Sequence, residues 1–190
     1  MADHLNMFMV VSMLGLDVRE LQVVLFDRLP DFAFKDLIQV AFSPSHPLKR
    51  AKDYPPGPVL FERLVFHLES PGSIIFPGMM DPMRCKGSEL WHGFRRHILQ
   101  AFGLWDVPPP PIPKVVLSVR RRTPAKNVGR ILANEGQLVE VLRKGNMMQF
   151  EVVDLAVMSL EEQLTTLRST SILVGVHGAG LMNAMFLAEE

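Results

Sequence analysis

Hydrophobic and polar residues alternate with a regular rhythm in the last third of the chain. Short apolar runs predict strands over residues 114–119, 150–155 and 171–176. The amphipathic segments between and after these runs predict helices over residues 134–144, 159–169 and from 179 onward. Strands and helices that alternate at this spacing indicate an α/β fold, in which a parallel sheet carries helices on its faces.

Strand and helix patterns also occur in the first half of the chain, in a less regular order. Helices are predicted over residues 3–16, 32–42 and 87–104. Strands are predicted over residues 21–27, 63–68 and 73–76. The helix over 87–104 has the clearest pattern, because its large apolar residues share one face and Ser88 can cap its start.

A proline-rich segment, residues 106–113, separates the two regions. It contains four consecutive prolines, Pro108 to Pro111, and a fifth at Pro113. Such a sequence forms a stiff, extended linker. We therefore expect a domain boundary at 106–113, with residues 1–105 and 114–190 in different domains.

Composition narrows the class of protein without identifying a partner. Hydrophobic residues make up 48% of the 190 residues and charged residues 21%, which is the profile of a globular protein with a real core. There are 20 basic and 20 acidic residues, so no overall charge favours nucleic acid or an anionic membrane. Cys85 is the only cysteine, which excludes a disulfide within the chain.

The apolar stretches of the sequence do not have the pattern of a signal peptide or a membrane span. No apolar run reaches the ~18 residues of a membrane span, and the first apolar stretch lacks the basic region of a signal peptide. The chain begins directly in a helix pattern and stops soon after a strand–turn–helix unit. We therefore expect a piece of a longer protein, truncated at both ends, in which any membrane association would come from flanking segments.

The last predicted strand ends in a histidine among glycines, Gly175-Val-His177-Gly178-Ala179-Gly180. In an open parallel sheet, ligands bind at the carboxyl ends of the strands, beside helix N-termini. The glycines allow a sharp turn and a close ligand, and the helix start from Ala179 favours a phosphate. A tight turn with an exposed histidine explains the same residues without any ligand.

Two arginines are predicted to share that edge of the sheet. Arg120 follows the strand over 114–119, and Arg130 precedes the next helix. Guanidinium groups bind a diphosphate through planar, charge-assisted hydrogen bonds, so Arg120, Arg130 and His177 could cradle one. We expect Arg121 and Arg122 to be solvated surface charges.

Three well-known site motifs are absent from the sequence. The turn at 177–180 lacks the third glycine of a dinucleotide fingerprint, which counts against a redox enzyme with a Rossmann fold. The sequence has no G-x-S-x-G nucleophile elbow, which counts against a lipase-type hydrolase. It has no Walker A motif either. No clear carboxylate cluster for a metal is visible either.

Residues 172–187, ILVGVHGAGLMNAMFL, closely resemble the signature of one glycosyltransferase family. The family contains the EGF-domain-specific O-linked N-acetylglucosamine transferase, the O-mannose N-acetylglucosaminyltransferase and plant xylan xylosyl- and arabinosyltransferases. Its signature reads roughly hGxHGAGLTnhhFLP. This chain differs at Met182, where threonine is usual, and at Ala188, where proline is usual.

The resemblance extends over nearly the whole chain. Residues 115–142 resemble the family's strand, arginine, loop, second arginine and helix. Residues 21–42 and 83–99 resemble the EGF-specific branch in particular. The start, ADHLNMFM, is similar to that branch's CDFLNLY, which places Asp3 on the family's aspartate. The histidine that precedes it in the family would lie before Met1.

The resemblance implies two Rossmann-like lobes of the GT-B type. Residues 1–105 would then be part of the acceptor-side lobe, and 114–190 an incomplete donor lobe. The family implies inverting transfer of a sugar, N-acetylglucosamine above all, from a UDP-sugar to a hydroxyl on a protein or glycan. It also implies the lumen of the endoplasmic reticulum or Golgi.

Site roles follow from the family and from the chemistry of transfer. Asp3 would take the proton of the acceptor hydroxyl. Arg120, Arg130 and the turn formed by His177, Gly178, Ala179 and Gly180 would stabilise the UDP leaving group. No cofactor is then required, although the need for a divalent metal stays open. Two alternatives stay open as well: an inactive nucleotide-sugar-binding fragment, and a plant-type pentosyltransferase that acts on polysaccharide.

Overall fold

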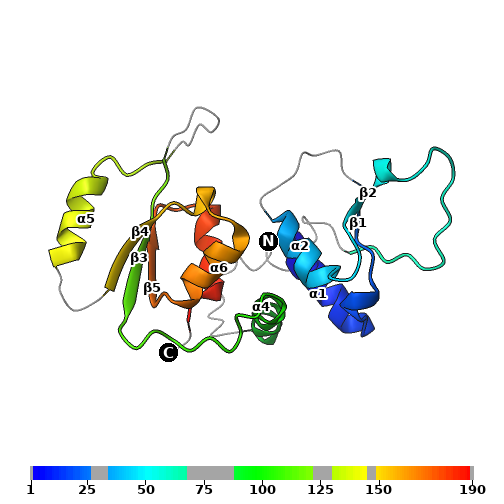
Figure 1. The fold of residues 1–190 in the computed structure, drawn as a ribbon, viewed down its shortest axis with the longest axis horizontal. Helices are drawn as coiled ribbons and strands as arrows, with labels where there is room; N and C mark the ends of the chain where they lie inside the picture. Colours follow the sequence, from blue (N-terminus) through cyan, green and yellow to red (C-terminus); the bar gives the residue numbers. More distant parts are fainter. Residues whose placement is uncertain (1, 27–33, 68–87, 122–129, 145–148, 189–190) are drawn as a thin grey trace. The chain divides into compact units, whose positions relative to one another are not determined.

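The structure is a computed structural model that describes residues 2–26, 34–67, 88–121, 130–144 and 149–188 (Figure 1). The chain divides into two compact units, residues 1–102 and residues 103–190. Each unit contains a parallel sheet, so the predicted mixture of helices with parallel strands is confirmed. The two-lobed GT-B architecture stays a prediction.

The second unit is built on a three-stranded parallel sheet. Its strands are β3 (Lys114–Ser118), β4 (Gln149–Val153) and β5 (Ile172–Gly175), in the order β4-β3-β5. Val115, Val116 and Leu117 of the central strand are all buried, as expected for a strand that is covered on both faces. All three strands were predicted from their apolar runs.

Helices follow the strands in the predicted order. They are α5 (Glu135–Lys144), α6 (Leu160–Arg168) and the 3₁₀ helix η5 (Ala179–Phe186). In Figure 1, α5 lies beside β4 at the far left, and α6 packs against η5 on the β5 side. The segment from 179 onward is thus helical as predicted, but with the tighter 3₁₀ hydrogen bonding.

The start of α6 has a complete capping box. The Ser159 hydroxyl accepts from the Glu162 amide at 3.2 Å, and the Ser159 amide donates to the Glu162 carboxylate at 2.7 Å. The hydrogen bond from the Ser159 amide lowers the pKa of the Glu162 carboxyl, with a further contribution from the Ser159 side chain. Ser88 also lies at an N-cap position, before α4, but its hydroxyl makes no capping hydrogen bond.

A buried arginine ties the proline-rich segment to the second unit. Arg168, at the end of α6, is 6% exposed and donates to four backbone carbonyls. The acceptors are Leu104 at 3.1 Å, Trp105 at 3.4 Å, Val107 at 2.6 Å and Leu187 at 3.2 Å. The division between the two units falls between residues 102 and 103, and these bonds hold the start of the segment against α6 within the second unit. The domain boundary expected at 106–113 stays a prediction.

The first unit is mainly helical. It contains α1 (Ala2–Leu14), α2 (Lys35–Phe42), α4 (Glu89–Ala101) and a short parallel pair of strands, β1 (Val24–Leu25) and β2 (Lys49–Arg50). Two single-turn 3₁₀ helices, Val18–Glu20 and Ala51–Asp53, flank the strands. Apolar side chains of the three α-helices form the core, including Leu5, Phe42, Phe94 and Ile98. His97 on α4 also bonds through Nε2 to the Ala41 carbonyl at 2.8 Å, which joins α4 to α2.

The first unit departs from the predictions in two places. The strand expected over 21–27 is reduced to Val24–Leu25. The strand expected over 63–68 is wrong for its described part, residues 63–67, where Leu64, Val65 and Phe66 are exposed and no strand among the described residues pairs with them. Apolar residues without a neighbouring strand leave the backbone no ladder to join. The predicted strand over 73–76 and Cys85 lie outside the described residues.

His4 is buried in an apolar environment. It is 6% exposed, its ring packs edge-on against Phe34, and neither ring nitrogen has a hydrogen-bond partner among the described residues. Burial lowers the pKa of His4 from 6.5 to about 3, with smaller contributions from the N-terminal charge and His67. The folded chain therefore resists protonation of this ring.

We expect His4→Phe to make folding less sensitive to acid. Between pH 6.5 and about 3 the unfolded chain binds a proton at His4 that the folded chain does not, so stability falls as the pH falls. Urea unfolding from pH 7 to pH 4 measures the effect. His97, whose pKa burial also lowers, leaves some acid sensitivity in the variant. His92→Gln, which removes an exposed ring, is the control; parallel pH profiles for the wild type and His4→Phe would contradict the expectation.

Arg168→Met is expected to destabilise the chain by roughly 2–4 kcal/mol, because it leaves buried carbonyls without a donor. Thermal unfolding followed by circular dichroism gives the change. Arg143→Met on the exposed surface of α5 is the matched control and should change the melting temperature little. A similar melting temperature for both variants would show that the four carbonyls do not depend on Arg168.

Candidate functional site

The carboxyl ends of β3 and β5 bring the predicted site residues to one edge of the sheet. The register pairs Ser118 with Gly175, so Arg120 and His177 each follow two residues after paired strand ends. At Gly175 an added Cβ would lie 3.1 Å from the Ser118 carbonyl oxygen and 3.1 Å from the Leu181 side chain. The absence of a side chain at Gly175 therefore lets the two strands and the start of η5 pack closely.

Arg130 forms two hydrogen bonds to His177. Its Nη1 donates to the His177 Nδ1 at 2.6 Å and to the His177 carbonyl oxygen at 2.9 Å. A guanidinium group has no acceptor, so Nδ1 accepts and the ring proton lies on Nε2. The contact fixes the tautomer of His177 and leaves Nε2–H as its second polar group.

Arg120 packs against Gly178. An added Cβ at Gly178 would lie 2.7 Å from the Arg120 Cζ and 2.8 Å from its Nη1, so a side chain there would displace the guanidinium from this position. The backbone of Gly178 is extended, with φ 161° and ψ 177°, which other residues also adopt. The backbone at Gly178 thus makes no sharp turn, and the missing side chain instead leaves the space that the Arg120 guanidinium occupies.

Gly180 leaves open space beside the start of η5. Ala179 begins η5, and the Leu181 amide donates to the Gly178 carbonyl at 2.9 Å. An added Cβ at Gly180 would meet no atom within 4 Å. The first N–H groups of a helix have no acceptor within the helix, which suits an anion at this end.

Asn183 fixes the other side of η5. It is 3% exposed and donates through Nδ2 to the Gln163 Oε1 at 3.0 Å, and the Gln163 Nε2 donates to the Met158 carbonyl at 3.1 Å. η5 is therefore held against α6 on the side away from solvent. The sequence placed Asn183 in the family signature but gave it no structural role.

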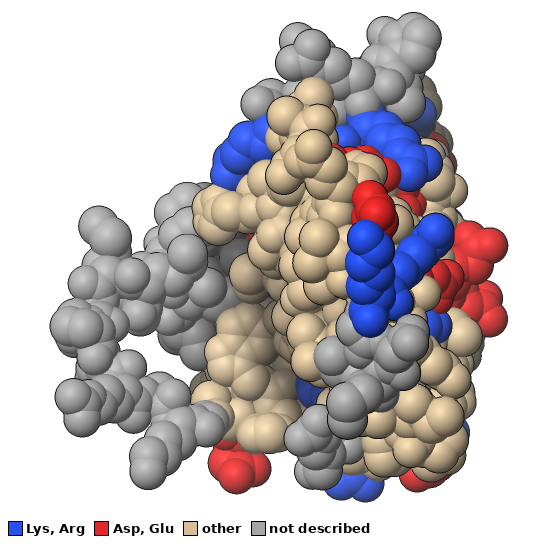
Figure 2. Space-filling model, turned by 90° about the vertical axis from the view of Figure 1, so that its left-hand side faces the viewer, with Lys and Arg blue, Asp and Glu red and all other residues tan. Residues whose placement is uncertain are grey.

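The two arginines and the histidine are accessible to a ligand. His177 and Arg130 are exposed, and Arg120 is half-buried. Figure 2 views the molecule from the side on which α5 lies, and shows Lys and Arg side chains interspersed with Asp and Glu. The candidate site is thus a local group of cations, in agreement with the zero net charge of the chain.

Arg121 has a specific partner that the sequence did not suggest. Its Nη2 lies 3.0 Å from the Glu135 Oε1, in the first turn of α5, and both groups are at the surface. The expectation of a surface charge is correct for Arg121, but it missed this ion pair. Arg122 lies outside the described residues.

Asp3 belongs to the other unit. It is exposed in the first turn of α1, where an acidic residue is favourable beside the helix N-terminus. The structure thus brings Arg120, Arg130, His177 and Gly178 together within the second unit. The assignment of Asp3 as a base stays a prediction.

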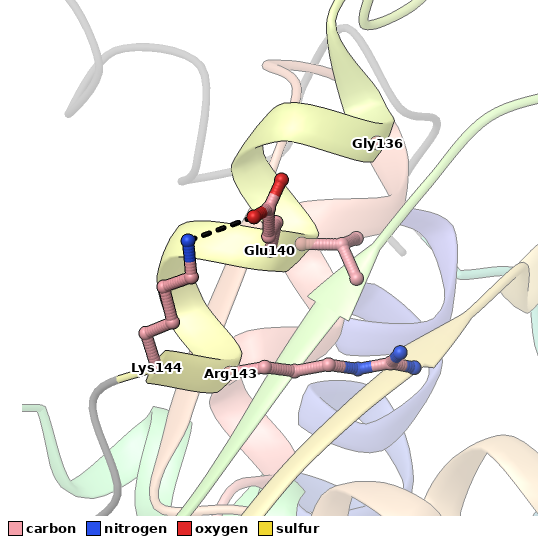
Figure 3. A pocket seen from close by; sticks show the side chains of 5 residues that line it. Gly136, Glu140, Arg143 and Lys144 are labelled. Carbon is pink, nitrogen blue, oxygen red and sulfur yellow. Dashed lines mark hydrogen bonds and ion pairs between the residues drawn. The ribbon is translucent and has the colours of Figure 1, made fainter.

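A separate hollow of about 450 Å³ lies along α5 (Figure 3). It is lined by Gly136, Val139, Glu140, Arg143 and Lys144, and the figure shows the ion pair between Lys144 and Glu140 across one turn of the helix. It shares no residue with the cluster at His177. We base the candidate site on that cluster, because it combines converging cations with a helix start at a sheet edge.

The described part of the chain has neither a metal cluster nor a membrane span. No three His, Cys, Asp or Glu side chains lie close enough to hold a metal ion. No helix in these ranges has the length and apolar character to cross a bilayer. The expectation that no cofactor is required stays a prediction.

Known proteins resemble the chain over different lengths. EGF domain-specific O-linked N-acetylglucosamine transferase from Gallus gallus is 29% identical over 107 residues, which is 55% of this chain and 19% of that protein. The enzyme of the same name from Xenopus laevis is 30% identical over 107 residues, or 55% and 20%. The one from Drosophila melanogaster is 28% identical over 171 residues, or 88% and 31%.

The chain therefore spans less than a third of the length of these relatives. A sequence profile of the family described as Glycosyltransferase 61 matches residues 1–190, from the first residue to the last. This match confirms the family suggested by the HGAG signature and by the arginines that precede it. The chain belongs to the glycosyltransferase 61 family.

Proposed function

We propose that the chain carries the donor-binding region of an inverting glycosyltransferase that uses a UDP-sugar. One observation carries the proposal: Arg120, Arg130 and His177 converge beside Gly178 at the carboxyl edge of a parallel sheet. Such a group of cations and N–H donors, next to a helix start, is suited to the diphosphate of a nucleotide. Family membership supports the same assignment.

The proposed reaction is a single displacement at the anomeric carbon. The acceptor hydroxyl oxygen forms a bond to the anomeric carbon while the bond between this carbon and the β-phosphate oxygen of UDP breaks. The bonding electrons leave with the diphosphate, where Arg120, Arg130 and the His177 Nε2–H stabilise the charge. The hydroxyl proton passes to a base, for which Asp3 is the candidate.

N-acetylglucosamine is the sugar we propose, with a protein or glycan hydroxyl as acceptor. The relatives described above are named for transfer of N-acetylglucosamine to EGF domains, and the match to the Drosophila enzyme covers most of this chain. We also propose that the protein is located in the lumen of the endoplasmic reticulum or Golgi.

One competing function is a fragment that binds a nucleotide sugar without transferring it. UDP binding without sugar release would identify it. The other is pentosyl transfer to polysaccharide, which a panel of UDP-sugars separates from N-acetylglucosaminyl transfer.

The central test is binding of UDP by the protein expressed at full length. Isothermal titration calorimetry should give tighter binding for UDP than for NAD. Arg130→Ala should weaken UDP binding about ten- to a hundred-fold, because it removes a charged contact worth ~1.5–3 kcal/mol and also frees His177. His177→Asn should reduce transfer at least about tenfold without loss of stability.

Arg143→Ala on α5 is the control for the loss of one positive charge. Tighter binding of NAD than of UDP, or equal effects of Arg130→Ala and Arg143→Ala, would exclude this site. Full transfer activity in His177→Asn would leave the histidine a turn residue only.

Gly178→Ala tests the contact with Arg120. The added methyl group occupies the position of the guanidinium, so Arg120 must move, and we expect UDP affinity to fall by about tenfold or more. The backbone at Gly178 is compatible with alanine, so the melting temperature should change little. Gly136→Ala on α5, where an added Cβ meets nothing, is the control. Unchanged UDP affinity in Gly178→Ala would remove Arg120 from the site.

A further inference from the structure

We infer that Arg121 and Glu135 form a positioning pair for the candidate donor site. The inference rests on the proposed function, because the pair acts on the placement of Arg120 and Arg130. Arg121 immediately follows Arg120, and Glu135 lies five residues after Arg130. Their ion pair, Nη2 to Oε1 at 3.0 Å, thus joins the two ends of the connection that carries both arginines.

Arg120 and Arg121 contact different parts of the unit. Arg120 lies against Gly178 in the turn after β5, whereas Arg121 reaches the first turn of α5. The two residues are adjacent beyond the end of β3, so an ion pair made by Arg121 restricts the backbone that also carries Arg120. The contact of Arg121 with α5 therefore favours the placement of Arg120 toward the turn.

The second end of the connection is held in the same way. Arg130 bonds to His177 through its side chain, and Glu135 begins the helix that follows. The helix N-terminus also favours the Glu135 carboxylate. Three contacts result: Arg120 packs against the turn, Arg130 forms hydrogen bonds to it, and Arg121 forms the ion pair with Glu135. Of these, only the ion pair between Arg121 and Glu135 uses none of the groups that we propose contact the ligand.

The pair is too exposed to matter much for overall stability. The side chain of Arg121 is 61% exposed and that of Glu135 30% exposed, and surface ion pairs contribute little to folding. Their effect should instead appear when a ligand binds. Without the pair, the connection that carries both arginines loses one of its contacts and the ligand must supply part of its ordering, which we expect to weaken binding by roughly three- to tenfold.

Charge reversal separates positioning from direct contact. Arg121→Glu and Glu135→Arg, singly and together, are compared by calorimetry with UDP, by steady-state kinetics with the UDP-sugar, and by thermal unfolding. Each single change should weaken UDP binding and raise KM by roughly three- to tenfold, with kcat and melting temperature nearly unchanged. The double variant restores an ion pair with the charges exchanged, and should recover most of the affinity.

The same helix offers a matched control. Lys144 and Glu140 form an exposed ion pair on α5, Nζ to Oε1 at 2.7 Å, outside the His177 cluster. Lys144→Glu, Glu140→Lys and their combination change the same charges on the same helix. We expect UDP affinity to stay within about twofold of the wild type in all three.

Three outcomes would overturn the positioning role. Single reversals at Arg121 and Glu135 with wild-type affinity would show that the pair is only a surface contact. Failure of the double variant to recover would show that Arg121 acts through its own charge on the ligand. Equal losses in the control pair would show a general effect of charge. Absence of UDP binding by the wild type would instead refute the proposed function.

Discussion

The register between β3 and β5 is the constraint on which the candidate site depends. Parallel strands bring their carboxyl ends to the same edge, and the pairing of Ser118 with Gly175 aligns those ends residue by residue. A shift by one residue would turn the following side chains to the opposite face. Arg120 and His177 would then no longer lie together. Gly175 contributes to this alignment because it has no side chain to separate the strands.

The sequence predicted most elements of the second unit because their hydrophobic patterns are strong. Apolar runs located β3, β4 and β5, and the amphipathic segment over residues 159–169 located α6. From these positions the meeting of Arg120 and His177 followed as a consequence of parallel topology. The partnership of Arg130 with His177 needed the structure, because a side chain reaching back across 47 residues leaves no pattern in the sequence.

Other features could not be predicted because they depend on tertiary neighbours. The apolar run at 63–67 looks like a strand, but a strand requires a partner, and the described residues provide none. Ser88 is a suitable cap by residue type, yet its hydroxyl takes no part in capping. The sequence does not distinguish Arg121 from the neighbouring arginines, because its partner Glu135 comes close only in the folded chain. The chemical type of each residue could be read from the sequence, whereas the residue that it contacts could not.

The hydrogen bond from Arg130 to the His177 Nδ1 has a consequence for what the turn can recognise. An imidazole usually can donate from one nitrogen and accept at the other, and so can match many groups. Here Nδ1 already accepts a hydrogen bond from Arg130, and a guanidinium group can only donate, so Nδ1 cannot become the donor. The histidine edge that faces outward can therefore only donate. Any atom that it contacts has to bring a lone pair, as phosphate, carbonyl and hydroxyl oxygens do, and an ammonium or amide N–H is turned away. The hydrogen bond between Arg130 and His177 thus makes this edge of the sheet selective for groups that accept a hydrogen bond.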